Sequence, residues 1–408
     1  MPAKIKNVKK SIYLILFKLG FLFIFFTFSP NSIYAKNIDS TKIKDDWYIE
    51  SALRYGRIVP NSSGTKLWNI NVIGADLRIG KQTFGKSEWE QWFGYPNYGL
   101  AFRYAHFSDN MLQDKIACFW FLSGSFVDSR HLSFRYQLGS GLVYFFNYYD
   151  PFKNKENVFI GSALNAHIDL NLSLDFTITK QIDLILRANF SHSSNGAIRF
   201  PNYGINPISG QLAVRYHFNE RAEKIYTIDT IKTFLPKNSL YFTLAPGFKQ
   251  SKKNYVYDNP DKYRVKTKYL TTTFQLGYLR QFHPKYRFGG GIDIMYSSEL
   301  RNFFPPEKQN EWKYMTTAGF VSFELLYNRF VVHAALAAYI SRSADFYEWY
   351  YERAGFKVLL GKNRNHSLGI TLKAHAGMID YIEWGYNFQF FNWNDKSVRT
   401  LKRFKKRV

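Results

Sequence analysis

Several features are missing from this sequence, and each absence excludes a class of protein. One of its 408 residues is a cysteine, Cys118, which excludes an intrachain disulfide and a cysteine-based zinc site. No two histidines have the spacing of a metal site, and the G-x-S-x-G turn of α/β-hydrolases is absent. Beyond the N-terminal region no stretch offers 18 uninterrupted apolar residues, so no membrane-spanning helix is expected there. We therefore expect neither a metal nor another cofactor.

Acidic residues are scarce, and the chain has a formal net charge of +24. Residues 1–35 contain five lysines and no acid, so the remainder carries 24 − 5 = +19. The basic start, an apolar run over residues 12–28 and the Ile33-Tyr34-Ala35 ending are typical of a cleaved secretory signal; an uncleaved membrane anchor is the alternative. An exported chain is not expected to bind nucleic acid. The charge indicates a solvated basic surface or an anionic partner such as phosphorylated lipid.

Alternation of apolar and polar residues dominates the chain after residue 45. In residues 164–176 the even positions are apolar and the odd positions are polar, which is typical of a strand with one apolar and one polar face. Similar segments recur at 46–58, 67–80, 98–108, 115–126, 131–148, 158–178, 182–194, 208–219, 238–250, 264–281, 286–298, 313–328, 329–343, 350–361, 366–377 and 381–391. Long alternating strands, a signal sequence and 19% aromatic residues predict an all-β, antiparallel transmembrane β-barrel of the Gram-negative outer membrane.

The number of barrels is open at this point. We expect a signal peptide at 1–35, a barrel region at 36–219, further strands or a second β-unit at 220–391, and a basic tail at 392–408. One barrel of roughly 12–16 strands is favoured, because a continuous wall leaves no unpaired edge in the membrane. An eight-stranded barrel followed by a second β-unit is the alternative. A secreted soluble β-sandwich fits less well, because the strands are unusually long.

A His–Ser pair ends the strand predicted at 182–194. Its even, apolar row runs through Ile182, Leu184, Leu186, Ala188 and Phe190 to His192 and Ser194. In a barrel this row faces lipid, whereas Ser193 points inward. The preceding turn at 179–181 is short and the following segment, 195–207, is long, which predicts that the pair lies near the extracellular end. A polar pair on a lipid-facing row is unfavourable unless it is satisfied or functional.

The pair has the chemistry of an esterase. His192 can act as general base on Ser194, whose hydroxyl is a weak nucleophile without one. Asn206 is the candidate that orients the imidazole. The side chains of Asn195 and Asn202, or backbone amides around Gly196, are candidates for stabilising an oxyanion.

The stretch "HSSNGAIRFPNYGIN" (192–206) resembles the H-x-S-N-[AG] … P-N-x-G motif of outer-membrane lipid A 3-O-deacylases, the PagL-like family, whose long members are labelled acyloxyacyl hydrolase. The resemblance covers roughly 46–219. It implies that Ser194 and His192 are catalytic, that Asn202 is the oxyanion asparagine, and that lipid A or lipopolysaccharide in the outer leaflet is the partner. The family's glutamate falls on Asn206, a departure from the pattern. An asparagine at that position resembles the Ser-His-Asn triad of outer-membrane phospholipase A, the alternative activity.

Two other histidines are weaker candidates for a site. His106 and Ser108 in "YAHFSDN" also form H-x-S on an apolar row, but no Asn-Gly follows the serine. His375, in "LKAHAGMIDYIEWGYNF", falls on a polar row and is expected to face the lumen. The alternative to an enzyme is a non-enzymatic barrel, a pore or structural protein with a decayed site. The asparagine at position 206, where the family has a glutamate, is the reason to consider it.

Overall fold

The computed structural model describes residues 46–59, 70–84, 87–220, 234–250, 268–304, 310–342, 348–376 and 378–394. Within these ranges the chain forms sixteen antiparallel β-strands and little helix, which confirms the predicted fold class. The expected signal peptide and nearly all of the expected basic tail lie outside the described residues.

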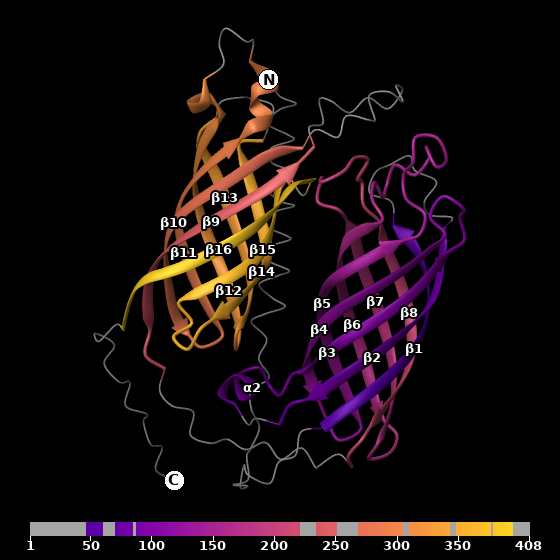
Figure 1. Cartoon of the computed structure of the whole chain (residues 1–408). Coiled ribbons are helices and arrows are strands. Elements are labelled where there is room, and N and C mark those ends of the chain that lie inside the picture. Colours follow the sequence, from indigo (N-terminus) through magenta and orange to yellow (C-terminus); the bar gives the residue numbers. More distant parts are fainter. Residues whose placement is uncertain are drawn as a thin grey trace, which may run out of the picture. The chain divides into compact units, whose positions relative to one another are not determined.

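The first eight strands close into one barrel, called the N-terminal barrel below (Figure 1). Each strand pairs with the next, and β1 returns to pair with β8, with Tyr48 opposite His217. The strands are β1 (Asp46–Val59), β2 (Asn71–Gln82), β3 (Asn97–Phe107), β4 (Asp114–Asp128), β5 (Leu132–Phe145), β6 (Leu164–Thr177), β7 (Ile182–Ser194) and β8 (Asn206–His217). A short helix, α2 (Glu88–Trp92), lies between β2 and β3.

The last eight strands close into the C-terminal barrel, in which β16 pairs with β9. The strands are β9 (Lys237–Lys249), β10 (Tyr269–His283), β11 (Tyr286–Ser297), β12 (Met315–Tyr327), β13 (Phe330–Ser341), β14 (Tyr350–Leu360), β15 (His366–His375) and β16 (Met378–Asn394). Two short 3₁₀ helices, η5 (Ser298–Phe303) and η7 (Glu311–Tyr314), follow β11.

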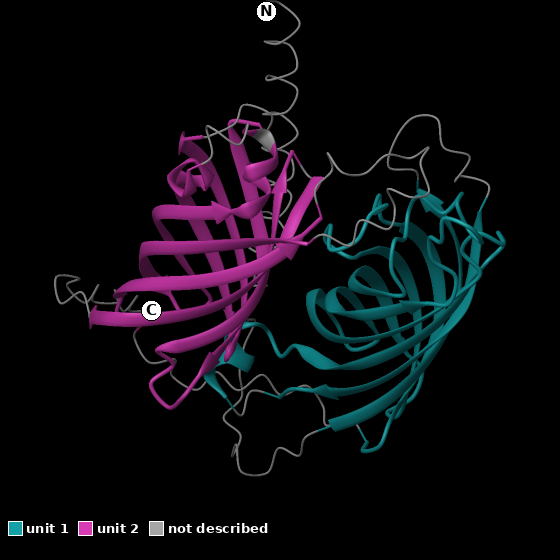
Figure 2. Ribbon diagram, turned by 45° about the horizontal axis from the view of Figure 1, so that its top comes forward, with its two compact units in different colours: residues 1–230, 255–264 teal, residues 231–254, 265–408 magenta. Residues whose placement is uncertain are grey.

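The expectation of a single closed wall is therefore wrong, although the total of sixteen strands lies within the expected range. Once β8 pairs with β1, the first barrel has no free edge to offer to β9, so the second set of strands closes on itself. β8 ends at His217 and β9 begins at Lys237, so the predicted boundary at 219/220 falls between the barrels. Figure 2 shows the corresponding compact units, residues 1–230 with 255–264 and residues 231–254 with 265–408.

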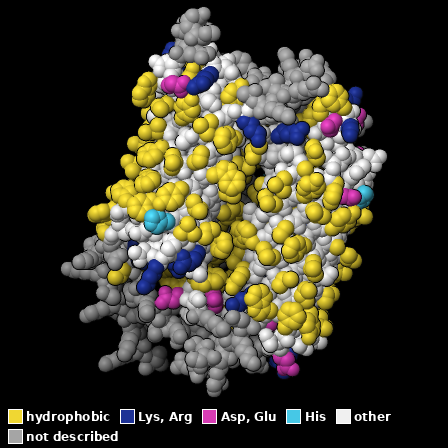
Figure 3. Space-filling model, viewed as in Figure 1, with side chains coloured by type: hydrophobic (Ala, Val, Ile, Leu, Met, Phe, Trp, Pro, Cys, Tyr) yellow, Lys and Arg dark blue, Asp and Glu magenta, His cyan; other side chains and the backbone are white. Residues whose placement is uncertain are grey.

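Alternation gives both barrels an apolar outer wall. Side chains such as Leu53, Leu100, Leu186, Val321 and Leu368 are between 47 and 72% exposed because they point away from the lumen. Figure 3 shows hydrophobic side chains spread over the outer walls. Such a surface is unfavourable in water and suits the hydrocarbon core of a bilayer. None of the described helices is long and apolar enough to cross a membrane.

The lumens are filled with paired charges. In the N-terminal barrel Glu50 binds Arg187 at 2.7 Å and Arg215 at 2.8 Å. In the C-terminal barrel Arg353 pairs with Asp293 and with Glu383. A cavity in each barrel, lined by lumen residues, has room of about 20 Å³, or roughly one water molecule. Large apolar residues additionally close the N-terminal barrel, including Ile58, Ile70, Phe107, Leu112, Phe145, Phe159, Ile160 and Ile205.

Candidate active site

The predicted His–Ser pair lies at the end of the N-terminal barrel that carries its long loops. Residues 146–163 and 195–205 connect strands at this end, whereas the short turns 129–131 and 178–181 lie at the other. Short turns are periplasmic and long loops extracellular in outer-membrane barrels. His192 and Ser194 therefore lie at the extracellular end of β7, as the sequence predicted.

The structure brings His192, Ser194 and Asn206 together. The Nε2 atom of His192 is 2.9 Å from Ser194 Oγ, and its Nδ1 atom is 2.6 Å from Asn206 Oδ1. An amide oxygen can only accept, so the Nδ1–H of the imidazole donates to Asn206 and Nε2 accepts from the serine hydroxyl. This tautomer is the one in which histidine acts as a general base on serine.

Strand register explains why these three side chains meet. Phe190 lies opposite Ile208 across β7 and β8, and Ser193 forms an isolated bridge with Ile205. His192 and Asn206 fall between these pairs on the outward face, so the hairpin places them opposite each other. Ser194 follows His192 on the same face, two residues along the strand.

The pair is less exposed to lipid than the alternation alone indicated. Ser194 is 4% exposed and Ser193, which points inward as predicted, is 0% exposed. The 195–205 loop folds back onto the strand through two hydrogen bonds of 3.0 Å between the backbones of Ser193 and Ile205. Ile205 belongs to the cluster of large apolar residues that closes the N-terminal barrel. The loop is therefore anchored to the barrel interior through this residue. The nucleophile candidate is therefore buried, and the loop that follows it returns to β7.

A neighbouring loop holds the 195–205 loop in place. The amide of Gly204 donates to Phe159 O at 3.0 Å, and the amide of Tyr203 donates to Val158 O. At Gly161 a Cβ would lie 2.3 Å from Pro201 O, so only glycine permits this approach.

Gly204 is similarly constrained. Its φ is +74°, and a Cβ there would lie 2.7 Å from His192 Cε1. Sequence reasoning did not assign Gly204, although it belongs to the quoted P-N-Y-G element.

The predicted oxyanion residues have different environments. The Asn202 Oδ1 accepts the backbone N–H of Asn195 at 2.9 Å, which leaves the Asn202 NH₂ group to point elsewhere. The Asn195 NH₂ group donates instead to Ser162 Oγ at 3.0 Å and to Arg199 O at 2.8 Å, so this side chain braces the loop. Gly196 is in the loop with a positive φ of 62°. Ser162 was missed, because nothing in its local sequence marks it.

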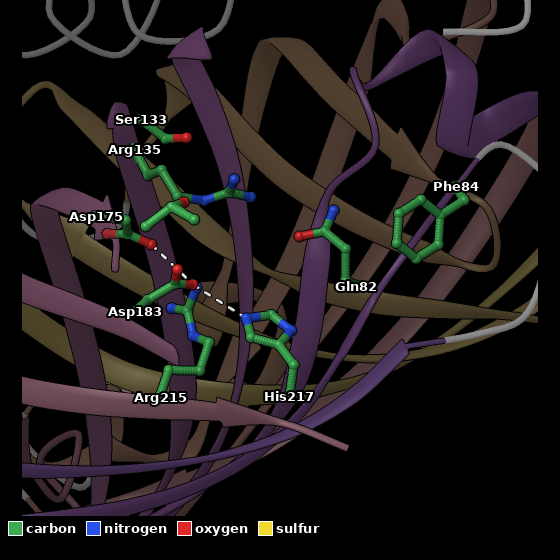
Figure 4. A pocket seen from close by; sticks show the side chains of 9 residues that line it. Gln82, Phe84, Ser133, Arg135, Asp175, Asp183, Arg215 and His217 are labelled. Carbon is green, nitrogen blue, oxygen red and sulfur yellow. Dashed lines mark hydrogen bonds and ion pairs between the residues drawn. The ribbon is translucent and has the colours of Figure 1, made fainter. Parts of the chain in front are cut away.

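The other histidines lie elsewhere. His167 and His375 face the lumens of the N- and C-terminal barrels, as their polar rows predicted, and both are buried. His217 lines a hollow at the turn end of the N-terminal barrel, opposite the end that carries Ser194 (Figure 4). Within that hollow Arg215 pairs with Asp175 at 3.0 Å, and His217 contacts Asp183 at 3.0 Å. The described residues contain no group of three or more His, Cys, Asp or Glu side chains that could hold a metal.

Two family models match this chain. Residues 73–215, in the N-terminal barrel, match the family described as lipid A 3-O-deacylase (PagL). Residues 238–393, in the C-terminal barrel, match the family described as acyloxyacyl hydrolase, C-terminal domain. The two matches together span most of the chain.

The chain belongs to the PagL-like family.

Solved structures resemble this PagL-like chain in form. The crystal structure of the outer membrane enzyme PagL is 19% identical and covers 40% of this chain and 97% of its own, with a TM-score of 0.28. The β domain of the Bordetella autotransporter BrkA (10% identity, 85% and 99% coverage, TM-score 0.22) and the NanC porin (5%, 84% and 99%, 0.16) are also similar. At these identities and scores the likeness says nothing of activity. No protein with a curated description matches the sequence.

Proposed function

We propose that this PagL-like protein is an outer-membrane lipid esterase that removes an ester-linked acyl chain from lipid A. The observation that carries the proposal is the continuous hydrogen-bonded series from Ser194 through His192 to Asn206 on the outward face of β7 and β8. A nucleophile, its base and a group that orients the base are the parts that acyl transfer requires.

Each residue has a defined task in the reaction. Ser194 Oγ attacks the ester carbonyl while its proton passes to His192 Nε2, and the sugar hydroxyl then leaves with that proton. Water, deprotonated by His192, releases the acyl group from Ser194 as a fatty acid. Asn206 accepts the Nδ1–H throughout and keeps the ring in its working tautomer.

The negative charge of the tetrahedral intermediate needs fixed donors. The Asn202 NH₂ group is the favoured side-chain donor, because its oxygen is held by the Asn195 amide and its orientation is therefore set. The backbone N–H of Gly196 is the favoured second donor. Asn195 is a poorer candidate than the sequence indicated, because its NH₂ group already donates to Ser162 and Arg199.

A phospholipase activity is the second candidate. It is favoured by one observation, the neutral amide of Asn206 in the position where the deacylase pattern has a glutamate. Both reactions use the same three side chains and differ in the lipid whose ester is bound. The filled lumens speak against the third possibility, a pore, since the lumen side chains are paired across each barrel.

The test uses the purified full chain in vesicles containing lipid A and phosphatidylethanolamine, with the products analysed by mass spectrometry. Loss of one acyl chain from lipid A is the expected result; lysophospholipid in its place would favour the phospholipase. Ser194→Ala should abolish either product. Ser191→Ala is the matched control, because Ser191 lies on the same strand, faces the lumen and has no hydrogen-bond partner among the described residues.

A further inference from the structure

A second His-x-Ser pair ends β3 and has no part in the site around Ser194. The outward row of β3 runs through Leu100, Phe102 and Tyr104 and ends in His106 and Ser108, just as the outward row of β7 ends in His192 and Ser194. Phe102 is 47% exposed and Tyr104 is 48% exposed, so this row belongs to the apolar outer wall. β3 also ends at the extracellular side, because the β3–β4 connection lies at the same end as the 195–205 loop.

A carboxylate lies opposite the histidine of this second pair. His106 is paired with Asp114 across β3 and β4, and its Nδ1 is 2.7 Å from Asp114 Oδ1. The hydroxyl of Tyr104 donates to the same carboxylate oxygen at 3.0 Å. Asn206 occupies the equivalent cross-strand position next to His192. The second pair therefore has a charged orienting group where the first has a neutral one, and Nε2 of His106 is left as the acceptor.

Ser108 is placed to serve this base. Its Oγ accepts the backbone N–H of Asn71 at 2.9 Å, which leaves its own O–H free to donate. His106 and Ser108 are two residues apart on one face, about 6.6 Å between Cα atoms. No hydrogen bond joins them in the part of the chain that the structure describes, so the contact requires a rotation of the Ser108 side chain. Such contacts often form only when substrate binds.

We propose that Ser108, His106 and Asp114 form a second esterase centre on the outer wall of the N-terminal barrel, acting on acyl esters of membrane lipids. Ser108 Oγ bonds to the ester carbonyl carbon, its proton moves to His106 Nε2, and the alcohol leaves with that proton. Water then hydrolyses the acyl-serine and regenerates the hydroxyl. Asp114 holds the imidazolium.

This centre is slower than the one at Ser194. There the Ser–His hydrogen bond is already formed at 2.9 Å, whereas Ser108 must first rotate. A displacement of about 1 Å in a reacting group costs roughly 10²-fold in rate. The apolar residues beside the pair, such as Ile116 at 47% exposure, indicate that its substrate is an ester at the lipid surface and not a soluble one.

Covalent labelling tests the inference without knowledge of the lipid. An alkyl fluorophosphonate reacts with an activated serine by forming an Oγ–P bond and releasing fluoride. The detergent-purified full chain and its Ser194→Ala variant are incubated with the probe, and adducts are located by peptide mass spectrometry. We expect a slow adduct at Ser108 in both proteins, about 10²-fold slower than the adduct at Ser194 in the unaltered chain.

The controls separate activation from chance reaction. His106→Asn and Asp114→Ala, each in the Ser194→Ala background, should remove the Ser108 adduct. Ser129, a serine of the β4–β5 turn whose hydroxyl bonds to the backbone of Leu132, should not react. Absence of a Ser108 adduct, an adduct that survives His106→Asn, or equal labelling of Ser129 would each overturn the second centre. The Ser194 adduct reports independently on the proposed function, so the two can fail separately.

Discussion

Gly204→Ala changes no group that takes part in chemistry, yet it should inactivate the site around Ser194. An added Cβ would lie 2.7 Å from His192 Cε1, against about 3.4 Å for an ordinary contact, so the ring must move by about 0.7 Å. The ring cannot move by this amount and keep both of its hydrogen bonds, at 2.6 and 2.9 Å. Misplacement of this size costs roughly 10²-fold in rate. The positive φ of 74° adds about 1 kcal/mol of backbone strain.

Two other glycines provide matched controls for this variant. Gly361 has φ +73° and no atom within 4 Å of an added Cβ, so Gly361→Ala introduces the same backbone strain without a clash. Gly210, on the outward face of β8, also has open space around it, and Gly210→Ala should be neutral. Acyl release from lipid A by the purified variants, with thermal unfolding followed by circular dichroism, measures activity and fold together. If the folded Gly204→Ala protein releases acyl chains at a rate within threefold of that of the unaltered chain, the predicted displacement of the His192 ring is refuted.

Substitutions at three other positions of the N-terminal barrel have defined expected outcomes. Asn206→Ala removes the acceptor of the His192 Nδ1–H and should lower kcat about 10²–10³-fold. Asn206→Asp keeps an acceptor and should retain more activity. Equal rates for the two variants would contradict the orienting role of Asn206. Asn202→Ala should lower kcat about 10²–10³-fold with little change in KM, and a change confined to KM would assign Asn202 to binding. Glu50→Gln leaves three arginines around a buried, neutral side chain. It should lower the free energy of unfolding, measured by urea titration, by about 3–5 kcal/mol. A variant as stable as the parent would show that the ion pairs of Glu50 contribute little to stability.

Much of the wall could be predicted from the sequence, because side-chain alternation is a local property. The strand predicted at 182–194 has those bounds in the structure, and the strand predicted at 46–58 ends one residue later, at Val59. The same alternation placed Ser193 inside and His192 outside. The role of Asn206, a cross-strand neighbour of His192, could be predicted from its position in the stretch that resembles the PagL-like motif.

The number of barrels could not be predicted in this way. Closure depends on whether β8 pairs with β1 or with β9, and all three strands have the same period-two pattern. The preference for one large barrel rested on avoiding free edges, which two closed barrels avoid equally well. Nor could the sequence reveal how the loops next to Ser194 are joined. The contact from Asn195 to Ser162 joins residues 33 positions apart and follows from the folding of two loops.

The proposed function requires above all that Ser194 acts on lipid A in the outer membrane. Lipid A is extracted from cells that express the unaltered chain, the Ser194→Ala variant or the Ser191→Ala control at equal levels in the outer membrane, and its acylation is read by mass spectrometry. The unaltered chain and Ser191→Ala should yield lipid A that has lost one ester-linked acyl chain, and Ser194→Ala should yield lipid A with its full set. Identical lipid A from all three strains, or deacylation that persists with Ser194→Ala, would contradict the proposed function.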